Sequence, residues 1–345
     1  MRLSDFAYEL PERLIAQEPA TPRDASRMLV VNRAEKTWQD AHFLDFPSFV
    51  QANDAVVLNN TKVFPARLIG EKKVSGGRVE LFLIREREPG IWEALVKPAR
   101  RFGVGARIKF GTSSLGAEVI QCLEEGLRLV KLQCEGSLEQ ELERVGQTPL
   151  PPYIKRPGGS SPEDRKRYQT VYARRRGAIA APTAGLHFTP GILDEVTARQ
   201  ARLIEITLHV GYGTFEPIRV DEVDEHSVAP ERYEISQDAA TTINQSQACG
   251  GRVMAIGTTT ARAVESAVDD AGQVHPRNDF TWLTIRPGYR FRAVEVLLTN
   301  FHLPQSSLLV LVAAFAGRDL VLQAYRHAVA AEYRFYSYGD CMLII

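Results

Sequence analysis

The spacing of hydrophobic positions changes twice along the chain. Near the start, residues 28–32 and 38–42 form two strand-like segments around the polar turn 33–36, which predicts a hairpin. A short helix near residues 47–51 then leads into the wholly apolar segment 55–58. A short, continuous apolar run of this kind is typical of a strand buried on both faces.

Between residues 66 and 144 the pattern becomes one of short strands with period two. Within residues 79–84, odd-numbered side chains point to one face of a strand and even-numbered side chains to the other. Several such strands in succession predict a small antiparallel barrel. A short helix at residues 138–145 and the proline-rich connector 148–152 end the segment, so we expect a domain boundary there.

After the connector, strands alternate with helices, which predicts a mostly parallel sheet covered by helices. The expected strands are residues 178–181, 203–208, 252–256, 294–298 and 341–345. One expected helix starts at Pro190 with Thr189 as its N-cap, and the others are residues 261–267, 307–316 and 319–332. We therefore expect an α/β fold, formed by residues 1–64 and 151–345, with an antiparallel β-barrel of residues 65–150 inserted into it.

Composition narrows the class of protein. The chain has 345 residues, 44% of them hydrophobic and 24% charged, as in ordinary globular proteins of two domains. Its first ten residues are no secretory signal, and its longest apolar run, residues 308–316, is shorter than the roughly 20 residues of a membrane span. Four scattered cysteines favour neither disulfides nor zinc. We expect a cytoplasmic enzyme without membrane contact.

Polar loops follow the predicted buried strands. In open α/β sheets, ligands bind beyond the carboxyl ends of the strands, where such loops converge. The loops are residues 59–62, 182–187, 209–214, 257–260 with Arg262, 299–302 and 338–340. We expect them to form one pocket.

Three of these loops contain a histidine: His187, His209 and His302. Any one of them could simply satisfy loop backbone groups, but three together favour catalysis. No zinc-type histidine spacing occurs, so we expect no metal, and the glycine-rich fingerprints of nicotinamide and ATP sites are missing as well. Arg262 lies in the first turn of a predicted helix, where a cation opposes the macrodipole, so it needs a structural carboxylate or an anionic ligand.

One segment is strongly basic although the whole chain has a net charge of +0. Residues 155–176 contain eight basic residues and two acidic ones, with Tyr168 and Tyr172 between them. A solvated charged surface and a local nucleic-acid contact both fit this composition.

Longer motifs occur in a fixed order along nearly the whole chain. They are LSDF at residues 3–6, IAQEP at 15–19, RDASR at 23–27, LNNTKV at 58–63, PAR at 65–67, YQTVY at 168–172, AAPTAGLHFT at 180–189, LHVG at 208–211, GTF at 213–215, GTT at 257–259, PGY at 287–289, LTNFHLP at 298–304 and YGD at 338–340. With them the sequence resembles the S-adenosylmethionine:tRNA ribosyltransferase-isomerases of queuosine biosynthesis.

The resemblance implies a reaction in which S-adenosylmethionine donates ribose. The ribosyl group passes to 7-aminomethyl-7-deazaguanine at the wobble position of a tRNA with a GUN anticodon and is rearranged, which gives epoxyqueuosine and releases adenine and methionine. It also implies an α/β domain with an inserted barrel, no metal, and no cofactor besides the co-substrate. We expect a monomer.

The resemblance and the loop positions together suggest roles for single residues. We expect His187 and His209 to transfer protons, with His302 as a third candidate, and Asp340 to face the sulfonium or the aminomethyl group. The residues expected to bind substrate are Asn60, Lys62, Thr183, Thr214, Thr258, Arg262, Asn300 and Tyr338. The residues expected to bind tRNA are Arg165, Arg167, Arg174, Arg175 and Arg176, with Lys62 beside them.

One motif departs from the family pattern. Members commonly show H-x-M-H-x-E, whereas residues 226–231 read HSVAPE, so Ala229 replaces a histidine. This substitution leaves a catalytically silent tRNA- or nucleotide-binding paralogue as the alternative. A methyltransferase with the same donor is a second alternative, disfavoured by the missing glycine-rich fingerprint.

Overall fold

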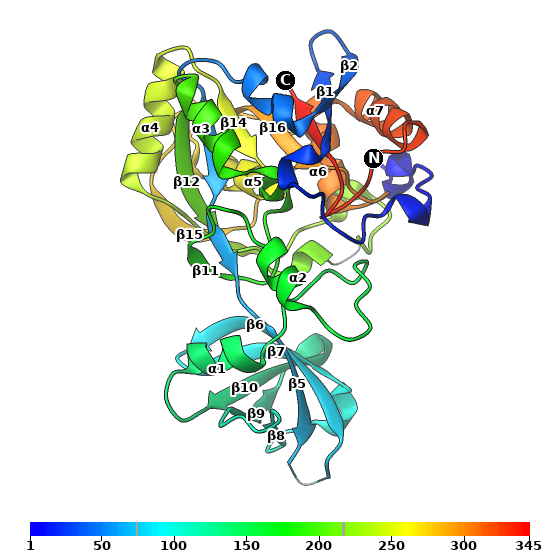
Figure 1. The fold of residues 1–345 in the computed structure, drawn as a ribbon, viewed down its shortest axis with the longest axis vertical. Helices are drawn as coiled ribbons and strands as arrows, with labels where there is room; N and C mark the ends of the chain where they lie inside the picture. Colours follow the sequence, from blue (N-terminus) through cyan, green and yellow to red (C-terminus); the bar gives the residue numbers. More distant parts are fainter. Residues whose placement is uncertain (74, 216–217) are drawn as a thin grey trace.

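The computed structural model describes residues 1–73, 75–215 and 218–345, and Figure 1 shows two bodies joined by narrow connections. The larger body contains both chain ends and a nine-stranded sheet in the order β15-β13-β12-β3-β14-β16-β17-β1-β2. Its strands are β1 (Arg27–Asn32), β2 (Thr37–His42), β3 (Ala55–Asn59), β12 (Arg202–Leu208), β13 (Glu231–Ile235), β14 (Val253–Ile256), β15 (Arg277–Thr281), β16 (Val294–Asn300) and β17 (Cys341–Ile344).

The sheet is mixed. In its middle, β12, β3, β14 and β16 are neighbours and run parallel. Outside them, β13 and β15 pair antiparallel on one side, and β17 is antiparallel to β16 on the other. The predicted α/β fold with a mostly parallel sheet is confirmed at the buried centre, and the sheet gains antiparallel pairings toward both edges. The edge strand β15 carries charged, exposed residues, and the neighbouring strand β13 has the charged Glu231 among its buried positions, so no apolar pattern marked either strand.

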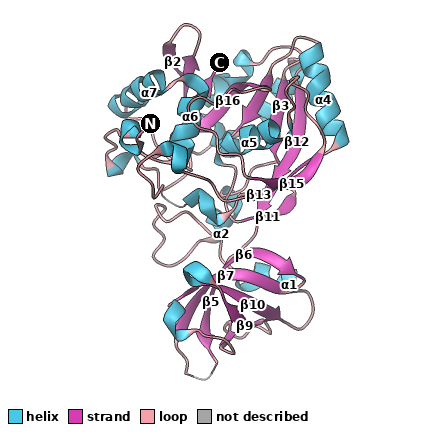
Figure 2. Ribbon diagram, turned by 180° about the vertical axis from the view of Figure 1, so that it is seen from behind, coloured by secondary structure: helices cyan, strands magenta, loops and turns pink. Residues whose placement is uncertain are grey.

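Helices cover both faces of the sheet, as Figure 2 shows from behind. The helices of this body are α2 (Pro162–Arg167), α3 (Pro190–Ala198), α4 (Gln237–Ala248), α5 (Thr258–Ala267), α6 (Ser307–Ala316) and α7 (Arg318–Ala330). Successive side chains of a strand belong to different cores: Val57 packs with α4–α7, whereas Val56 packs with α3 and its neighbours. A strand covered on both faces must be apolar throughout, which explains the unbroken apolar run of β3.

Two predicted elements differ from the structure. The strand expected at residues 178–181 is wrong: β11 (Arg175–Ala178) ends where that strand was expected to begin. It pairs with β4 (Thr61–Val63) in a separate two-stranded sheet. The helix expected at residues 47–51 is the 3-10 helix η4 (Phe43–Phe49), with Pro47 inside it. The other 3-10 helices are η1 (Leu3–Phe6), η2 (Glu12–Leu14), η3 (Arg23–Ala25), η5 (Ala99–Arg101), η6 (Glu124–Gly126), η7 (Thr183–His187), η8 (Tyr212–Phe215) and η9 (Val223–Glu225).

The smaller body is a closed antiparallel barrel with a core of its own. Its strands, in barrel order, are β10 (Leu127–Gln133), β7 (Ile91–Lys97), β6 (Arg78–Glu88), β5 (Arg67–Lys72), β8 (Arg107–Lys109) and β9 (Gly116–Cys122). The alternation predicted for residues 79–84 is confirmed, since Val79, Leu81 and Leu83 are buried in the barrel. Helix α1 (Leu138–Val145) adds Leu142 to the same core.

No single helix among the described residues is long and apolar enough to cross a membrane. Helices α6 and α7 reach the length and apolar composition of a span only when taken together, and the chain bends by 116° between them.

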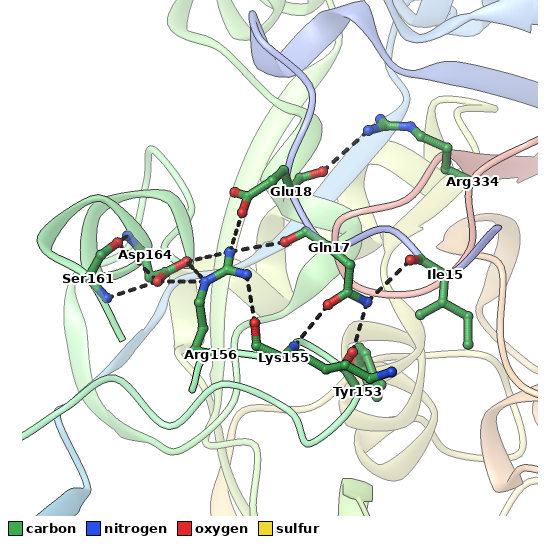
Figure 3. A network of polar contacts seen from close by, with 9 residues as sticks. All are labelled: Ile15, Gln17, Glu18, Tyr153, Lys155, Arg156, Ser161, Asp164 and Arg334. Carbon is green, nitrogen blue, oxygen red and sulfur yellow. Dashed lines mark hydrogen bonds and ion pairs between the residues drawn. The ribbon is translucent and has the colours of Figure 1, made fainter. Parts of the chain in front are cut away.

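Three segments far apart in sequence are joined by the polar network of Figure 3. The guanidinium of Arg156 binds both carboxylate oxygens of Asp164 at 3.0–3.2 Å and donates to the carbonyl of Gln17 at 3.0 Å. The Gln17 amide, in turn, donates to the carbonyl of Tyr153 at 2.9 Å. This network fixes the connector between the barrel and α2 against the N-terminal segment.

The Asp164 carboxylate is the buried anchor of this network. Burial alone would raise its pKa, but hydrogen bonds from Arg156 and Ser161 outweigh burial and lower the pKa. The charged form therefore stabilises the folded chain above the unfolded-state pKa of about 4, and this stabilisation is lost as the pH falls through the lower folded-state value.

We predict that Asp164→Asn lowers the free energy of unfolding at pH 7 by about 2 kcal/mol, because it removes the charge-assisted hydrogen bonds of the partly buried Arg156 guanidinium and leaves the exposed Glu18 as the remaining carboxylate partner of Arg156. Urea denaturation at pH 7, and stepwise from pH 5 to pH 3, measures this. The variant should lose less stability than the parent over the acid range. Glu163→Gln, an exposed neighbour in α2, is the control, and equal destabilisation by the two variants would contradict the assignment.

Candidate active site

Loops from both halves of the chain meet at one edge of the sheet. The parallel strands β12, β3, β14 and β16 all end there. Because β17 is antiparallel to β16, its first residue, Cys341, pairs with the last residue of β16, Asn300. Cys341 also pairs with Met28 at the start of β1. The segments before β1 and β17 therefore reach the same edge as the loops after the central strands.

A cavity of about 460 Å³ opens at this edge. Four of the predicted substrate or catalytic residues line it: Thr183, Thr258, Asn300 and His302. Its other walls are Pro152, Tyr153, Tyr168, Ala180, Ala181, Pro182, Ala184, Val210, Gly257, Thr259, Thr299, Leu303, Pro304, Gln305, Ser306, Ser307, Leu308, Tyr336 and Ser337. We call this the reaction cavity; its size is in the range that holds a nucleoside-sized ligand.

The first turn of α5 forms part of the cavity wall. Gly257 directly precedes the helix with a φ of +96°, a conformation that L side chains rarely adopt, and its N–H donates to Leu298 at 2.8 Å. Thr258 and Thr259 follow in the wall. The first N–H groups of a helix have no partner within it, so this turn can donate to polar groups of a ligand.

His187 is buried beside the cavity and does not line it. Its Nδ1 lies 2.9 Å from the hydroxyl of Ser26, which donates to the carbonyl of Arg23, so Nδ1 carries the proton. Its Nε2 then accepts from the side-chain amide of Asn300 at 3.2 Å. Burial, together with the charges of Arg334 and Arg23, lowers the pKa of His187 to about 3. His187 is therefore neutral, and both ring nitrogens have partners.

Asn300 is held from several sides. Besides His187, its Nδ2 contacts the carbonyls of Tyr336 at 3.2 Å and Asp340 at 3.4 Å, which fixes the nitrogen end of the amide. Within the described part of the chain, its Oδ1 is buried without a hydrogen-bond partner.

His302 lines the reaction cavity itself. Its Nε2 lies 2.8 Å from the hydroxyl of Thr299, and its backbone N–H donates to Tyr325 at 3.1 Å. Among the residues that the structure describes, Nδ1 has no protein partner. Burial lowers the pKa of His302 to about 3, so the ring is neutral at physiological pH. Of the three histidines, His302 is the one in the cavity wall.

His209 faces a second hollow. It lines a cleft of about 1110 Å³ between the barrel and the larger body, and the next residue, Val210, lines both this cleft and the reaction cavity. Its Nδ1 lies 2.8 Å from the hydroxyl of Thr61. Burial, and the nearby Arg232 and Arg175, lower its pKa. Gly177 packs against the ring, and a Cβ there would come within 2.7 Å of it.

Several predicted substrate residues have protein partners elsewhere. Arg262 forms a buried ion pair with Glu231. Of the two partners that the sequence allowed for Arg262, a structural carboxylate or an anionic ligand, the structure shows the carboxylate. The Asp340 carboxylate accepts backbone N–H groups at 3.1 Å and 2.8 Å, the second from Arg334. Asn60 bonds to Glu205 and Thr207.

The remaining predicted substrate residues also lie away from the cavity wall. Tyr338 borders a small separate cavity behind His187, and Lys62 is exposed on β4. The side chain of Thr214 lies outside the described residues.

The predicted tRNA-binding arginines fall into two groups. Arg165 donates to the carbonyl of Glu143 at 2.8 Å, and Arg167 donates to the Thr21 hydroxyl at 3.1 Å, so the first joins α2 to α1 and the second joins α2 to the N-terminal segment. Residues 174–176 instead line an open pocket on the surface of the larger body.

Sequence reasoning missed the aromatic wall of the reaction cavity. Tyr153 and Tyr336 face each other there with ring centroids 3.8 Å apart. Tyr153 lies next to the predicted connector, where proline marked a boundary but nothing marked a ligand wall.

The segment that departs from the family pattern borders the interdomain cleft. Ala229 lies next to Gly213, and a Cβ added to Gly213 would lie 2.8 Å from the Cβ of Ala229. A larger residue at either position would narrow this part of the cleft. In the described ranges, no group of three or more His, Cys, Asp or Glu side chains could hold a metal ion.

Comparison with known proteins gives matches along nearly the whole chain, as the motifs do. A family model described as "Queuosine biosynthesis protein" matches residues 3–344. The chain is 48% identical over 345 residues to the S-adenosylmethionine:tRNA ribosyltransferase-isomerases of Pelotomaculum thermopropionicum and Symbiobacterium thermophilum, with 100% of each chain covered. A crystal structure of S-adenosylmethionine tRNA ribosyltransferase from Thermotoga maritima covers 99% of this chain and 100% of that one, at 33% identity and a TM-score of 0.56. The resemblance carried by the motifs is thus confirmed, and the chain belongs to the queuosine biosynthesis protein family.

Proposed function

We propose that this chain is an S-adenosylmethionine:tRNA ribosyltransferase-isomerase. It transfers the ribosyl group of S-adenosylmethionine to 7-aminomethyl-7-deazaguanine at the wobble position of tRNA, rearranges it, and releases adenine and methionine. The observation that carries the proposal is the reaction cavity, which gathers Thr183, Thr258, Asn300 and His302 at the loop edge of the sheet in a chain whose full-length relatives have this name.

The chemistry requires proton transfers in a site shielded from water. The cationic sulfur of the donor acidifies the neighbouring C5′ protons, so a base must remove one of them. Adenine leaves more easily when protonated, and the aminomethyl group must be neutral to attack. A neutral imidazole can serve the first step because its lone pair is available at physiological pH.

His302 is the best candidate for the base in the cavity. It lines the wall, and no group of the described chain occupies its Nδ1. His209 is the second candidate, because it reaches the cleft next to the cavity. His187 is assigned a positioning role instead, since it holds the amide of Asn300.

Further parts of the proposal concern partners and place. The RNA partner is a tRNA with a GUN anticodon, no metal or further cofactor takes part, and the enzyme works in the cytoplasm as a monomer. The polar first turn of α5 supports donor binding, because its free N–H groups and the Thr258 hydroxyl can reach hydroxyls or a carboxylate of the donor.

Product analysis tests the function directly. We predict that the purified chain, incubated with S-adenosylmethionine and tRNA carrying the 7-aminomethyl-7-deazaguanine base, releases adenine and methionine in equal amounts. Mass spectrometry of the digested tRNA should show the added ribosyl-derived group. Unmodified tRNA is the control. Absence of adenine would favour the silent paralogue, whereas S-adenosylhomocysteine would indicate a methyltransferase.

A variant of His302 tests the assignment of the base. We predict that His302→Ala lowers kcat by about 10²–10⁴-fold, the usual contribution of one general acid or base. Because the pKa of His302 is lowered to about 3, this group should add no acid limb to the kcat profile between pH 5 and pH 8.

Initial rates of adenine release, measured over this pH range, show both effects. His275→Ala, which changes an exposed histidine outside the cavity, is the control, and thermal melting checks the fold of each variant. Near-normal turnover of folded His302→Ala, together with a large loss in His209→Ala, would transfer the role to His209.

A further inference from the structure

A second, strongly cationic pocket lies on the larger body, next to the interdomain cleft. It has a volume of about 340 Å³ and is formed between β11 and β13. Its lining residues are Arg174, Arg175, Arg176, Thr207, His209, Arg232, Tyr233 and Glu234. We call it the arginine pocket.

Two of its four arginines are not neutralised by the protein. Arg174 pairs with Glu205 at 3.2 Å and Arg176 with Glu139 of the barrel at 2.8 Å. In the described part of the chain, Arg175 and Arg232 form no ion pair with a carboxylate, and the one carboxylate in the pocket wall is Glu234. Both arginines are exposed, and Arg232 donates one hydrogen bond to the neutral side-chain amide of Asn278 at 3.3 Å. The pocket therefore offers an anion from solvent two guanidinium groups whose charge no carboxylate partner among the described residues offsets.

Aromatic side chains extend this surface along the sheet edge. Phe280 of β15 is the register partner of Arg232, so both side chains lie on the same face. Phe280 and Trp282 pack with ring centroids 6.1 Å apart, and Trp282 is 63% exposed. A large aromatic ring exposed beside unpaired arginines is the combination that binds single-stranded nucleic acid, by phosphate contacts and base stacking.

The arginine pocket is also close to the proposed chemistry. His209 lines both the pocket and the interdomain cleft, and Val210, the next residue, lines the reaction cavity. Consecutive residues in the loop after β12 therefore line the two sites.

We propose that Arg175 and Arg232 bind a backbone phosphate of the RNA substrate next to the modified nucleotide, and that Phe280 and Trp282 stack on a neighbouring unpaired base. The proposal rests on the proposed function, since it names the surface that holds the RNA of that reaction. The proposed RNA-binding surface includes residues of β13 and β15 in addition to the basic segment, and it assigns Arg165 and Arg167 a structural role.

The charge part is tested by the salt dependence of RNA binding. The probe is a synthetic anticodon stem-loop RNA, and its affinity is measured by fluorescence anisotropy between 50 mM and 300 mM KCl. Arg175→Gln and Arg232→Gln should each flatten the slope of log affinity against log salt by about 0.7, which means about fivefold weaker binding at ~0.1 M salt.

Arg277→Gln is the matched control, because Arg277 is an exposed arginine of β15, the strand that pairs with β13, and its register partner is Ile235. Positions 277 and 280 differ by an odd number, so their side chains lie on opposite faces. This control should keep the slope of the parent. A slope of Arg232→Gln equal to that of Arg277→Gln would overturn the proposal.

The stacking part has a different signature. Trp282→Ala should weaken RNA binding about tenfold without changing the salt slope, because stacking on an aromatic ring does not neutralise phosphate. The KM for S-adenosylmethionine should stay unchanged in all these variants. Loss of a concentration-dependent dimer in Trp282→Ala, with RNA affinity retained, would assign the aromatic patch to protein association and overturn this part.

The outcomes separate the inference from the function on which it rests. Adenine release by the parent chain with precursor tRNA, combined with unchanged RNA affinity in every variant, overturns the arginine pocket alone. No adenine release and no RNA binding by the parent overturns the function as well. Inorganic phosphate up to 10-fold above the RNA phosphate concentration, at constant ionic strength, should not displace the RNA if Phe280 and Trp282 contribute; full displacement overturns the joint site.

Discussion

The pairing of β17 with β16 and β1 is the constraint on which the site depends. Four parallel strands bring the loops that follow them to one edge of the sheet, but the segments before β1 and β17 reach that edge only because β17 runs back against β16. Asn300 at the end of β16 is thereby placed beside the carbonyl of Asp340 and the ring of His187. A shift of this register by one residue would turn these side chains to the other face of the sheet.

Burial at this edge determines what the histidines can do. His187 and His302 are both removed from water, and the free energy of charging them in that environment lowers both pKa values to about 3. The same neutral ring has different uses in the two places. Both nitrogens of His187 are engaged by protein groups, so it orients Asn300, whereas His302 keeps one nitrogen open in the described cavity wall. A residue type in a loop motif therefore cannot reveal the role, because the role depends on the partners.

The sequence predicted the central strands and most helices because burial leaves a clear pattern there. The unbroken apolar run of β3 and the alternation in β6 both follow from which faces are covered. The edge strand β15 carries no such pattern, since most of its side chains stay in water. In the neighbouring strand β13, one of the buried positions is Glu231, whose ion pair with Arg262 satisfies its charge, so its buried face is not apolar in sequence. The loops after the strands were also predictable, but the contact of Tyr153 with Tyr336 was not, because it joins segments that are far apart in the sequence.

The arginines show the same limit of composition. The basic stretch at residues 155–176 contains side chains of one type in very different positions. Arg156 and Arg165 bind protein oxygens and hold the connector in place, so their charge is used inside the molecule. Arg175, from the same stretch, has no carboxylate as an ion-pair partner among the described residues. It lines the same pocket as Arg232, which belongs to a strand that the sequence did not predict. The cationic surface proposed for RNA is therefore made by tertiary structure, which neutralises some charges of a basic segment and brings others together with distant ones. This is why a chain with a net charge of +0 can still present two guanidinium groups without carboxylate partners, among the described residues, in one surface pocket.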